Sequence, residues 1–182
     1  AANGDLLLVR EGTYSGFSVV AKRVAIVAQP GADVEILGSI TVEQTLALQE
    51  VLLRGLRVEQ PGGAGASILD CQGVVWIEDC LFRAANGDAQ SADGYAGIEA
   101  IDSGRVVLQR TWAYGGHGQS YIPIPFFQPH GAGGDGLRAE GTTVAVAGGH
   151  YQGGIGGSVA DDDAAWSGGR GGHGIWLDGF PN

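Results

Sequence analysis

The sequence is poor in basic residues: it has ten, of which Lys22 is the only lysine, against 20 acidic residues. This balance gives a net charge of −10 and leaves no basic stripe that could neutralise a phosphate backbone, so we expect no nucleic-acid partner. The excess of acid also repels polyanionic polysaccharides unless a cation bridges the two. A neutral glycan meets no such repulsion.

Long apolar runs are absent as well. No stretch approaches the roughly 18 consecutive apolar residues that a membrane-spanning helix needs, so we expect no membrane span. The sequence contains no methionine, opens without a charged and apolar leader, and enters a strand pattern almost at once. We therefore expect a single domain over residues 1–182 that is a trimmed part of a longer chain.

Cysteine is scarce too. Cys71 and Cys80 are the only two, and strand alternation places both side chains on inward positions. Two interpretations stay open, a disulfide or a pair of small buried thiols, because two cysteines alone do not identify the redox compartment.

The chain does contain a strand cassette that recurs about every 24 to 38 residues. It reads EVLLRGLRV at 50–58, VVWIEDCLF at 74–82, VVLQRTWAY at 106–114 and TVAVAGGHY at 143–151. Aligning Gly73 with Gly104 superposes the second and third copies without a gap, and a shift of 38 residues superposes the third and fourth. Self-similarity at such a period is typical of a solenoid, in which each unit buries its apolar face by stacking on the next.

The alternation within the cassettes predicts which aliphatic side chains point inward and stack from unit to unit. The predicted inner stack comprises Val24, Ile26, Val51, Leu53, Val75, Ile77, Val106, Leu108, Val144 and Val146. Between the cassettes lie glycine-rich intervals, which lengthen toward the C-terminal half. The 34 glycines show no collagen-like period, so we expect them to form turns between ordered segments.

The segment GDLLLVREGTYSGF at 4–17 resembles the first coil of parallel β-helix proteins of the pectate-lyase-like superfamily. The later cassettes and GIWLDG at 174–179 resemble successive coils, so the resemblance covers essentially the whole chain. It implies an all-β, right-handed parallel β-helix of about five to six coils, with long loops in the C-terminal half. This superfamily includes polysaccharide lyases, glycoside hydrolases and noncatalytic surface proteins, so the fold alone does not select an activity.

Candidate catalytic residues come from the same resemblance. The polygalacturonase branch uses a GHG motif downstream of paired aspartates, and here Asp161, Asp162 and Asp163 precede the GHG that contains His173. The NTD and RIK motifs of that branch are missing, and hydrolysis needs two carboxylates held at a defined separation. We therefore expect no complete catalytic site.

A calcium site is the second candidate. GAGGDGL at 131–137 resembles one calcium-binding nonapeptide repeat, which makes Asp135 a candidate ligand. Such sites are shared between tandem turns, and this copy is isolated, so a plain glycine turn is the expected alternative and no cofactor is predicted. The four histidines lack a recognised zinc-ligand spacing.

Aromatic residues provide the candidate binding residues, since a sugar ring stacks on an aromatic face and a protein partner docks on one. They are Trp112, Tyr114, Tyr121, Phe126, Phe127, Trp166 and Trp176. For the run YIPIPFF at 121–127 the alternative is that it folds over the solenoid and buries itself.

The function expected from these observations is a secreted or cell-surface β-helix scaffold that binds a polysaccharide or a surface protein through its loop face. The first alternative is a polysaccharide-active enzyme, of lyase or glycoside hydrolase type, of which this chain is a portion. The second alternative is a structural solenoid that self-associates end to end or through its loops, because stacked coils expose strand edges at both ends.

Overall fold

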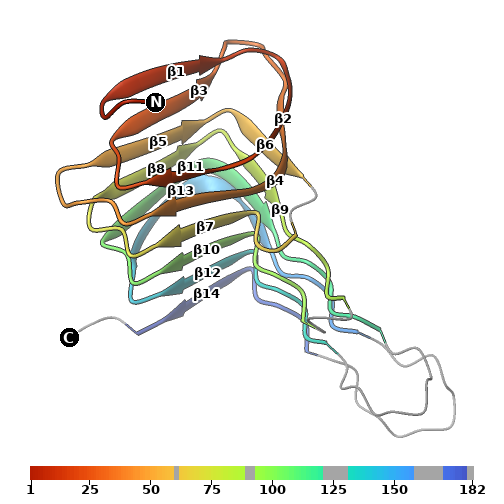
Figure 1. The fold of residues 1–182 in the computed structure, drawn as a ribbon. Helices are drawn as coiled ribbons and strands as arrows, with labels where there is room; N and C mark the ends of the chain where they lie inside the picture. Colours follow the sequence, from red (N-terminus) through yellow and green to blue (C-terminus); the bar gives the residue numbers. More distant parts are fainter. Residues whose placement is uncertain (60–61, 89–92, 121–130, 158–169, 180–182) are drawn as a thin grey trace, which may run out of the picture.

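The computed structural model describes residues 1–59, 62–88, 93–120, 131–157 and 170–179. In these residues the chain forms strands and no helix, and every strand pair is parallel. A helix with the length and apolar character to cross a membrane is not found in this described part of the chain. The strands wind into a prism whose three faces are each a parallel sheet (Figure 1). The predicted all-β parallel solenoid is confirmed.

Six coils build the three faces. Face 1 contains β1 (Asp5–Val9), β3 (Val24–Ala28), β5 (Glu50–Arg54), β8 (Val74–Glu78) and the first halves of β11 (Arg105–Tyr114) and β13 (Thr143–Gln152). Face 2 contains the first halves of β2 (Gly12–Val20) and β4 (Val34–Glu43), then β6 (Leu56–Glu59), β9 (Leu81–Arg83) and the second halves of β11 and β13. Face 3 contains the second halves of β2 and β4, then β7 (Ala66–Leu69), β10 (Ile98–Ile101), β12 (Leu137–Glu140) and β14 (Ile175–Asp178).

The predicted inner stack has the register that the repeat offsets imply. Val106 pairs with Val75 on one side and with Val144 on the other. The eight stack residues of the second to fifth coils are at most 7% exposed, and Val144 packs against the core. Val146 lies in the sixth coil, where the described residues cover only one side, and it is 44% exposed.

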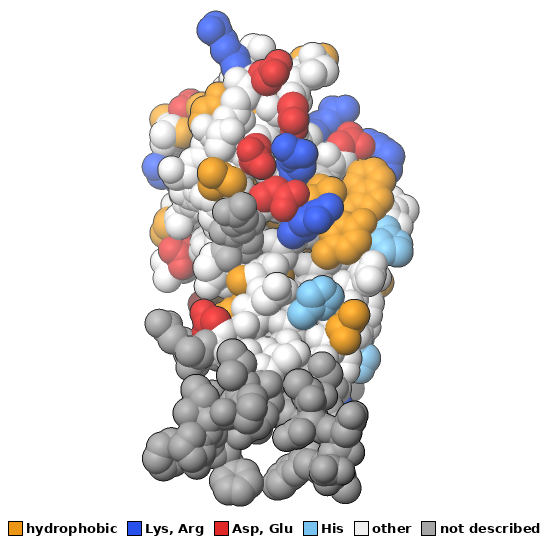
Figure 2. Space-filling view, turned by 90° about the vertical axis from the view of Figure 1, so that its right-hand side faces the viewer, with side chains coloured by type: hydrophobic (Ala, Val, Ile, Leu, Met, Phe, Trp, Pro, Cys, Tyr) orange, Lys and Arg blue, Asp and Glu red, His pale blue; other side chains and the backbone are white. Residues whose placement is uncertain are grey.

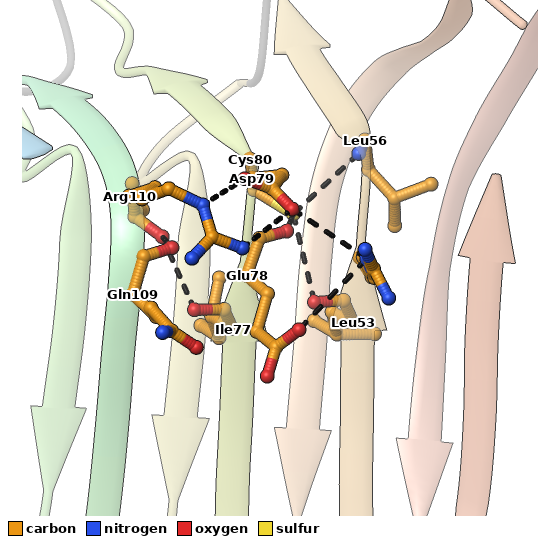
Figure 3. Close-up of polar contacts among 10 residues, drawn as sticks. Leu53, Leu56, Ile77, Glu78, Asp79, Cys80, Gln109 and Arg110 are labelled. Carbon is orange, nitrogen blue, oxygen red and sulfur yellow. Dashed lines mark hydrogen bonds and ion pairs between the residues drawn. The ribbon is translucent and has the colours of Figure 1, made fainter. Parts of the chain in front are cut away.

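A column of left-handed residues turns the chain from face 1 to face 2. Gly55, Asp79, Arg110 and Gly148 occupy this corner in successive coils, with φ values of 71°, 51°, 47° and 74°. A side chain with a Cβ is disfavoured in this region, so the two non-glycine residues need compensation. The guanidinium of Arg110 donates to both carboxylate oxygens of Asp79, over 2.6 and 2.9 Å, and Arg54 lies 3.5 Å from the same carboxylate (Figure 3). The ion pairs therefore help to hold the corner.

The two cysteines are buried, free thiols at different corners of the prism. They flank the five-residue strand β8, which spans roughly 16 Å, whereas a disulfide needs Cα atoms within about 7 Å of each other. Of the two interpretations, the pair of free thiols is therefore confirmed. Cys80 accepts a weak hydrogen bond from the amide of Leu56 at 3.5 Å (Figure 3), and burial raises the pKa of its thiol to about 12.

A glycine-rich extension leaves the prism at the corner between faces 2 and 3 (Figure 1). In the fourth to sixth coils the chain runs outward along one segment and returns along another before β10, β12 or β14 begins. We call these segments the legs. They comprise residues 84–87, 94–97, 115–118, 131–136, 153–157 and 170–174. The predicted lengthening of the intervals toward the C-terminal half is confirmed.

The legs are not strands, but their backbones are hydrogen-bonded to one another. Legs that occupy the same position in successive coils are joined by a backbone hydrogen bond at every third residue. Gly94, for example, donates to the carbonyl oxygen of Ala132. Three residues later, Gly97 donates to that of Asp135. A second set of backbone hydrogen bonds joins outgoing legs to returning legs. In this set Gly172 donates to Gly154, Gly154 to Gly134, Gly134 to Gly116 and Gly116 to Tyr95. A three-residue period is that of polyproline II chains, which have no hydrogen bonds of their own and here bond to neighbours.

The glycines of the legs are required by space, which corrects the expectation that they form turns. Neither Gly116 nor Gly134 has a positive φ. A Cβ on Gly116 would collide with the carbonyl oxygen of Ala85, and a Cβ on Gly134 with that of Tyr95. Backbone cannot give way as a flexible side chain can, so these positions must remain glycine for the legs to pack.

Candidate functional site

The outer surface of face 2 carries an aromatic cluster in the fourth to sixth coils. Alternation along β11 turns Thr111 and Ala113 into the core, both fully buried, and turns Trp112 and Tyr114 outward. Trp112 is 41% exposed. The two side chains thus project from the same side of β11, two residues apart.

Neighbouring coils complete the cluster through the strand register. Leu81 and His150 flank Trp112 in one column, and Arg83 and Gln152 flank Tyr114 in the next. We call these outward residues the aromatic platform, which comprises Leu81, Arg83, Trp112, Tyr114, His150 and Gln152. On this side of the molecule, Figure 2 shows large hydrophobic side chains next to basic and histidine side chains.

The platform residues contact one another around Tyr114. The guanidinium carbon of Arg83 lies 5.5 Å from the centre of the Tyr114 ring, within the range of a cation–π interaction. The His150 ring is tilted against Tyr114 with centroids 5.7 Å apart. His150 also approaches the side-chain amide oxygen of Gln152, with Nε2 at 3.4 Å. These contacts position the rings of Tyr114 and His150 before any ligand arrives.

The charges beside the platform are largely paired. Arg83 forms an ion pair with Glu59 at 3.3 Å, and in the preceding coils Arg57 lies 3.6 Å from Glu35. Exposed pairs of this kind contribute little to stability, but they cancel local charge. The platform consequently presents aromatic faces and hydrogen-bonding groups without a strong net field.

The other predicted aromatic residues are not all part of this cluster. Trp176 lies outward on β14 of face 3, where the Arg138 guanidinium approaches its ring at 5.3 Å. It is therefore separated from Trp112 and Tyr114 by a corner of the prism. Tyr121, Phe126, Phe127 and Trp166 lie outside the described residues.

Among the candidate catalytic and metal residues, His173 and Asp135 lie together. Both belong to returning legs, and one carboxylate oxygen of Asp135 accepts from the backbone amide of His173 at 2.7 Å. The same oxygen is 3.1 Å from Nδ1 of the His173 ring. The Asp135 carboxylate thus provides the hydrogen-bond acceptor for the backbone amide of His173 in the neighbouring coil. Asp161, Asp162 and Asp163 lie outside the described residues, so their assignment as catalytic candidates stays a prediction.

Among the described residues, no group of three histidine, cysteine or acidic side chains has a metal-binding arrangement, and Asp135 as a calcium ligand stays a prediction. Asp135 in particular is engaged by the amide and ring of His173. The predicted glycine turn at 131–137 is replaced by a leg of the bundle, in which Gly133 and Gly136 donate backbone hydrogen bonds to the neighbouring coil.

Four platform residues were not singled out from the sequence: Leu81, Arg83, His150 and Gln152. The signal was present in the repeat offsets, because a shift of 31 carries residues 81 and 83 onto 112 and 114, and a shift of 38 carries these onto 150 and 152. Applying the register to outward as well as inward positions would have found them.

Comparison with known proteins does not assign this site to a family. No family model matches the sequence, and no curated protein or solved structure matches the chain.

Proposed function

We propose that this protein is a noncatalytic β-solenoid scaffold, secreted or at the cell surface, that binds a neutral polysaccharide through the aromatic platform. The observation that carries the proposal is the exposed Trp112 on the same outward side of β11 as Tyr114, with Arg83, His150 and Gln152 at the neighbouring register positions. Sugar rings present C–H faces that pack on aromatic rings, and their hydroxyl groups pair with amide, imidazole and guanidinium groups.

Two features favour a neutral glycan over an acidic one. The cation on the platform, Arg83, is already paired with Glu59. The protein as a whole carries a net charge of −10, which repels a polyanion at long range. A neutral polysaccharide loses little solvation free energy on such a surface, because few charged groups must be stripped of water.

We also propose that the chain belongs to the parallel β-helix proteins of the pectate-lyase-like superfamily. In support, the resembling segment GDLLLVREGTYSGF covers the first coil, that is β1 and most of β2. The later resembling cassettes coincide with strands of faces 1 and 2, and GIWLDG contains β14.

The test is a binding screen by isothermal titration calorimetry and tryptophan fluorescence. The probes are a β-glucan, a xylan, an arabinan, a polygalacturonate and an alginate, each with and without calcium. We expect binding of at least one neutral polysaccharide, and a loss of affinity of about tenfold or more for Trp112→Ala and for Tyr114→Ala. The matched control is Trp176→Ala, which removes a tryptophan stacked by an arginine on another face and should bind like the wild type.

Three results would overturn the proposal. They are binding of none of the neutral polysaccharides, equal losses for Trp112→Ala and Trp176→Ala, and release of new reducing ends or unsaturated uronate from any probe. The last result would support the alternative of a polysaccharide-active enzyme, with Asp161, Asp162, Asp163 and His173 as its candidate residues.

A further inference from the structure

The outer surface of face 1 has an apolar column along its middle. One residue from each coil contributes to it, and the strand register aligns all six. The apolar column comprises Leu6, Ala25, Leu52, Trp76, Val107 and Ala145. Leu6 is 60% exposed and Trp76 is 36% exposed, although strand alternation predicts polar residues on a solvated face, while Val107 is only 8% exposed.

The equivalent columns of the other faces differ. On face 3 the outward residues of the third to fifth coils are Ser67, Glu99 and Arg138. On face 2 the second and third coils carry Glu35 and Arg57. In the fourth and fifth coils the same column of face 2 continues with Leu81 and Trp112 of the platform. An outer column that is apolar through all six coils is therefore specific to face 1. A parallel sheet with apolar residues on both surfaces is typical of a sheet that is covered on both sides.

Residues of opposite charge lie on the two sides of the apolar column. Glu50 and Arg54 lie at opposite ends of β5, one on each side of the column, and the half-exposed Arg54 also lies 3.8 Å from Glu78 and 3.5 Å from Asp79 of its own chain. Arg105 begins β11 and Glu78 ends the adjacent strand β8, again on opposite sides. A twofold axis parallel to the solenoid axis would place Glu50 of one copy opposite Arg54 of another, twice per pair. It would also bring Arg105 near Glu78 of the other copy.

We propose that face 1 is a self-association surface on which two copies of this chain dock with their coils aligned. The apolar columns then lie against each other, and acidic groups meet basic groups on both sides. Reversing the coil order about β5 instead places Glu50 against Glu50 and Arg54 against Arg54. Like charges in contact disfavour that alternative.

The size of the surface sets the expected strength of the dimer. Six strands about 4.8 Å apart, each spanning about 16 Å, give a flat area of roughly 400 Å² per copy. A stable interface of standard size uses about 800 Å² per partner. We therefore expect a weak, reversible dimer that forms in the micromolar to millimolar range and leaves both aromatic platforms accessible. The inference does not depend on what the platform binds.

The test is sedimentation equilibrium over a concentration series up to about 1 mM, with thermal unfolding of every variant as the folding check. We expect the wild type to dimerise and Trp76→Glu to stay monomeric up to the highest concentration. The matched control is Trp112→Glu, which puts the same charge in place of an equally exposed tryptophan on face 2. It should dimerise like the wild type.

Charge reversal tests the relative orientation of the two copies. Glu50→Lys and Arg54→Glu should each weaken the dimer by about tenfold or more, since each creates two like-charge contacts. The double variant Glu50→Lys/Arg54→Glu should regain most of the wild-type affinity, because the swapped charges face each other again. A wild type that is monomeric at 1 mM, equal effects of Trp76→Glu and Trp112→Glu, or no recovery in the double variant would each overturn the proposal.

Discussion

The prism and the legs are two regions of one chain that are held together by different forces. In the prism, apolar side chains stack along the axis, and residues such as Leu53, Ile77 and Leu108 are completely buried. In the legs, the side chain is mostly a hydrogen atom, and backbone amides such as those of Gly116 and Gly134 bond from leg to leg. The comparison shows that a repeat protein can extend its layers beyond its apolar core if glycine occupies the positions where the extended segments meet.

The difference also explains why glycine is used differently in the two regions. In the prism Gly55 and Gly148 occupy the corner where φ is positive, and Asp79 and Arg110 take the same conformation in the coils between them. The corner therefore favours glycine but tolerates other residues. In the legs, a glycine that lies beside a neighbouring carbonyl group has no room for a Cβ, so substitution by another residue is tolerated much less.

The largest effect is expected from removing part of the apolar stack in the prism. Ile77→Ala should lower the free energy of unfolding by about 2 to 5 kcal/mol, because it leaves a cavity at a fully buried position between two coils. The outward neighbour Glu78→Gln is the control and should change stability by less than about 1 kcal/mol. Urea unfolding followed by circular dichroism measures both. Equal effects of the two substitutions would mean that the inward and outward positions have been misassigned.

A smaller and more local effect is expected in the legs, where two adjacent glycines provide a matched pair. A Cβ on Gly172 would collide with the carbonyl oxygen of Gly134, whereas a Cβ on Gly171 would lie 3.6 Å from that of Gly154, an ordinary contact. Gly172→Ala should speed hydrogen exchange of the leg amides by about tenfold or more while the prism keeps its protection. Gly171→Ala should leave both regions unchanged. If the two variants behave alike, close packing does not stabilise the legs.

The smallest effect is expected at the corner of the prism and depends on pH. The hydrogen bonds from Arg110 hold the pKa of Asp79 below its ordinary value, against the opposing effect of desolvation. The ionised carboxylate therefore stabilises the fold at pH values above its unfolded-state pKa, and this contribution disappears as the pH falls through the lower folded-state pKa. Asp79→Asn should be less stable than the wild type near neutral pH and equal to it at low pH. Chemical unfolding at several pH values measures the difference, and a gap that stays constant with pH would contradict the assignment.

Much of the prism could be predicted from the sequence because each coil repeats the same local pattern. Alternation in the cassettes identified inward residues such as Val75 and Leu108, and the offsets of 31 and 38 gave their partners in the next coil. The candidate site was predicted only in part. Trp112 and Tyr114 were identified by residue type, whereas Arg83 and His150 join them only through the register of face 2.

The sequence by itself indicated that the chain stacks coil upon coil, because a two-residue alternation of apolar groups at a recurring interval lets each unit bury its apolar side chains against the next. Only the tertiary structure decided how the glycine-rich intervals fold. Their hydrogen bonds join residues from different coils, and a glycine carries no side-chain pattern that could reveal its neighbour. Only the tertiary structure shows where one face of the prism ends and the next begins, and so only it assigns Trp112 to face 2 and Trp176 to face 3.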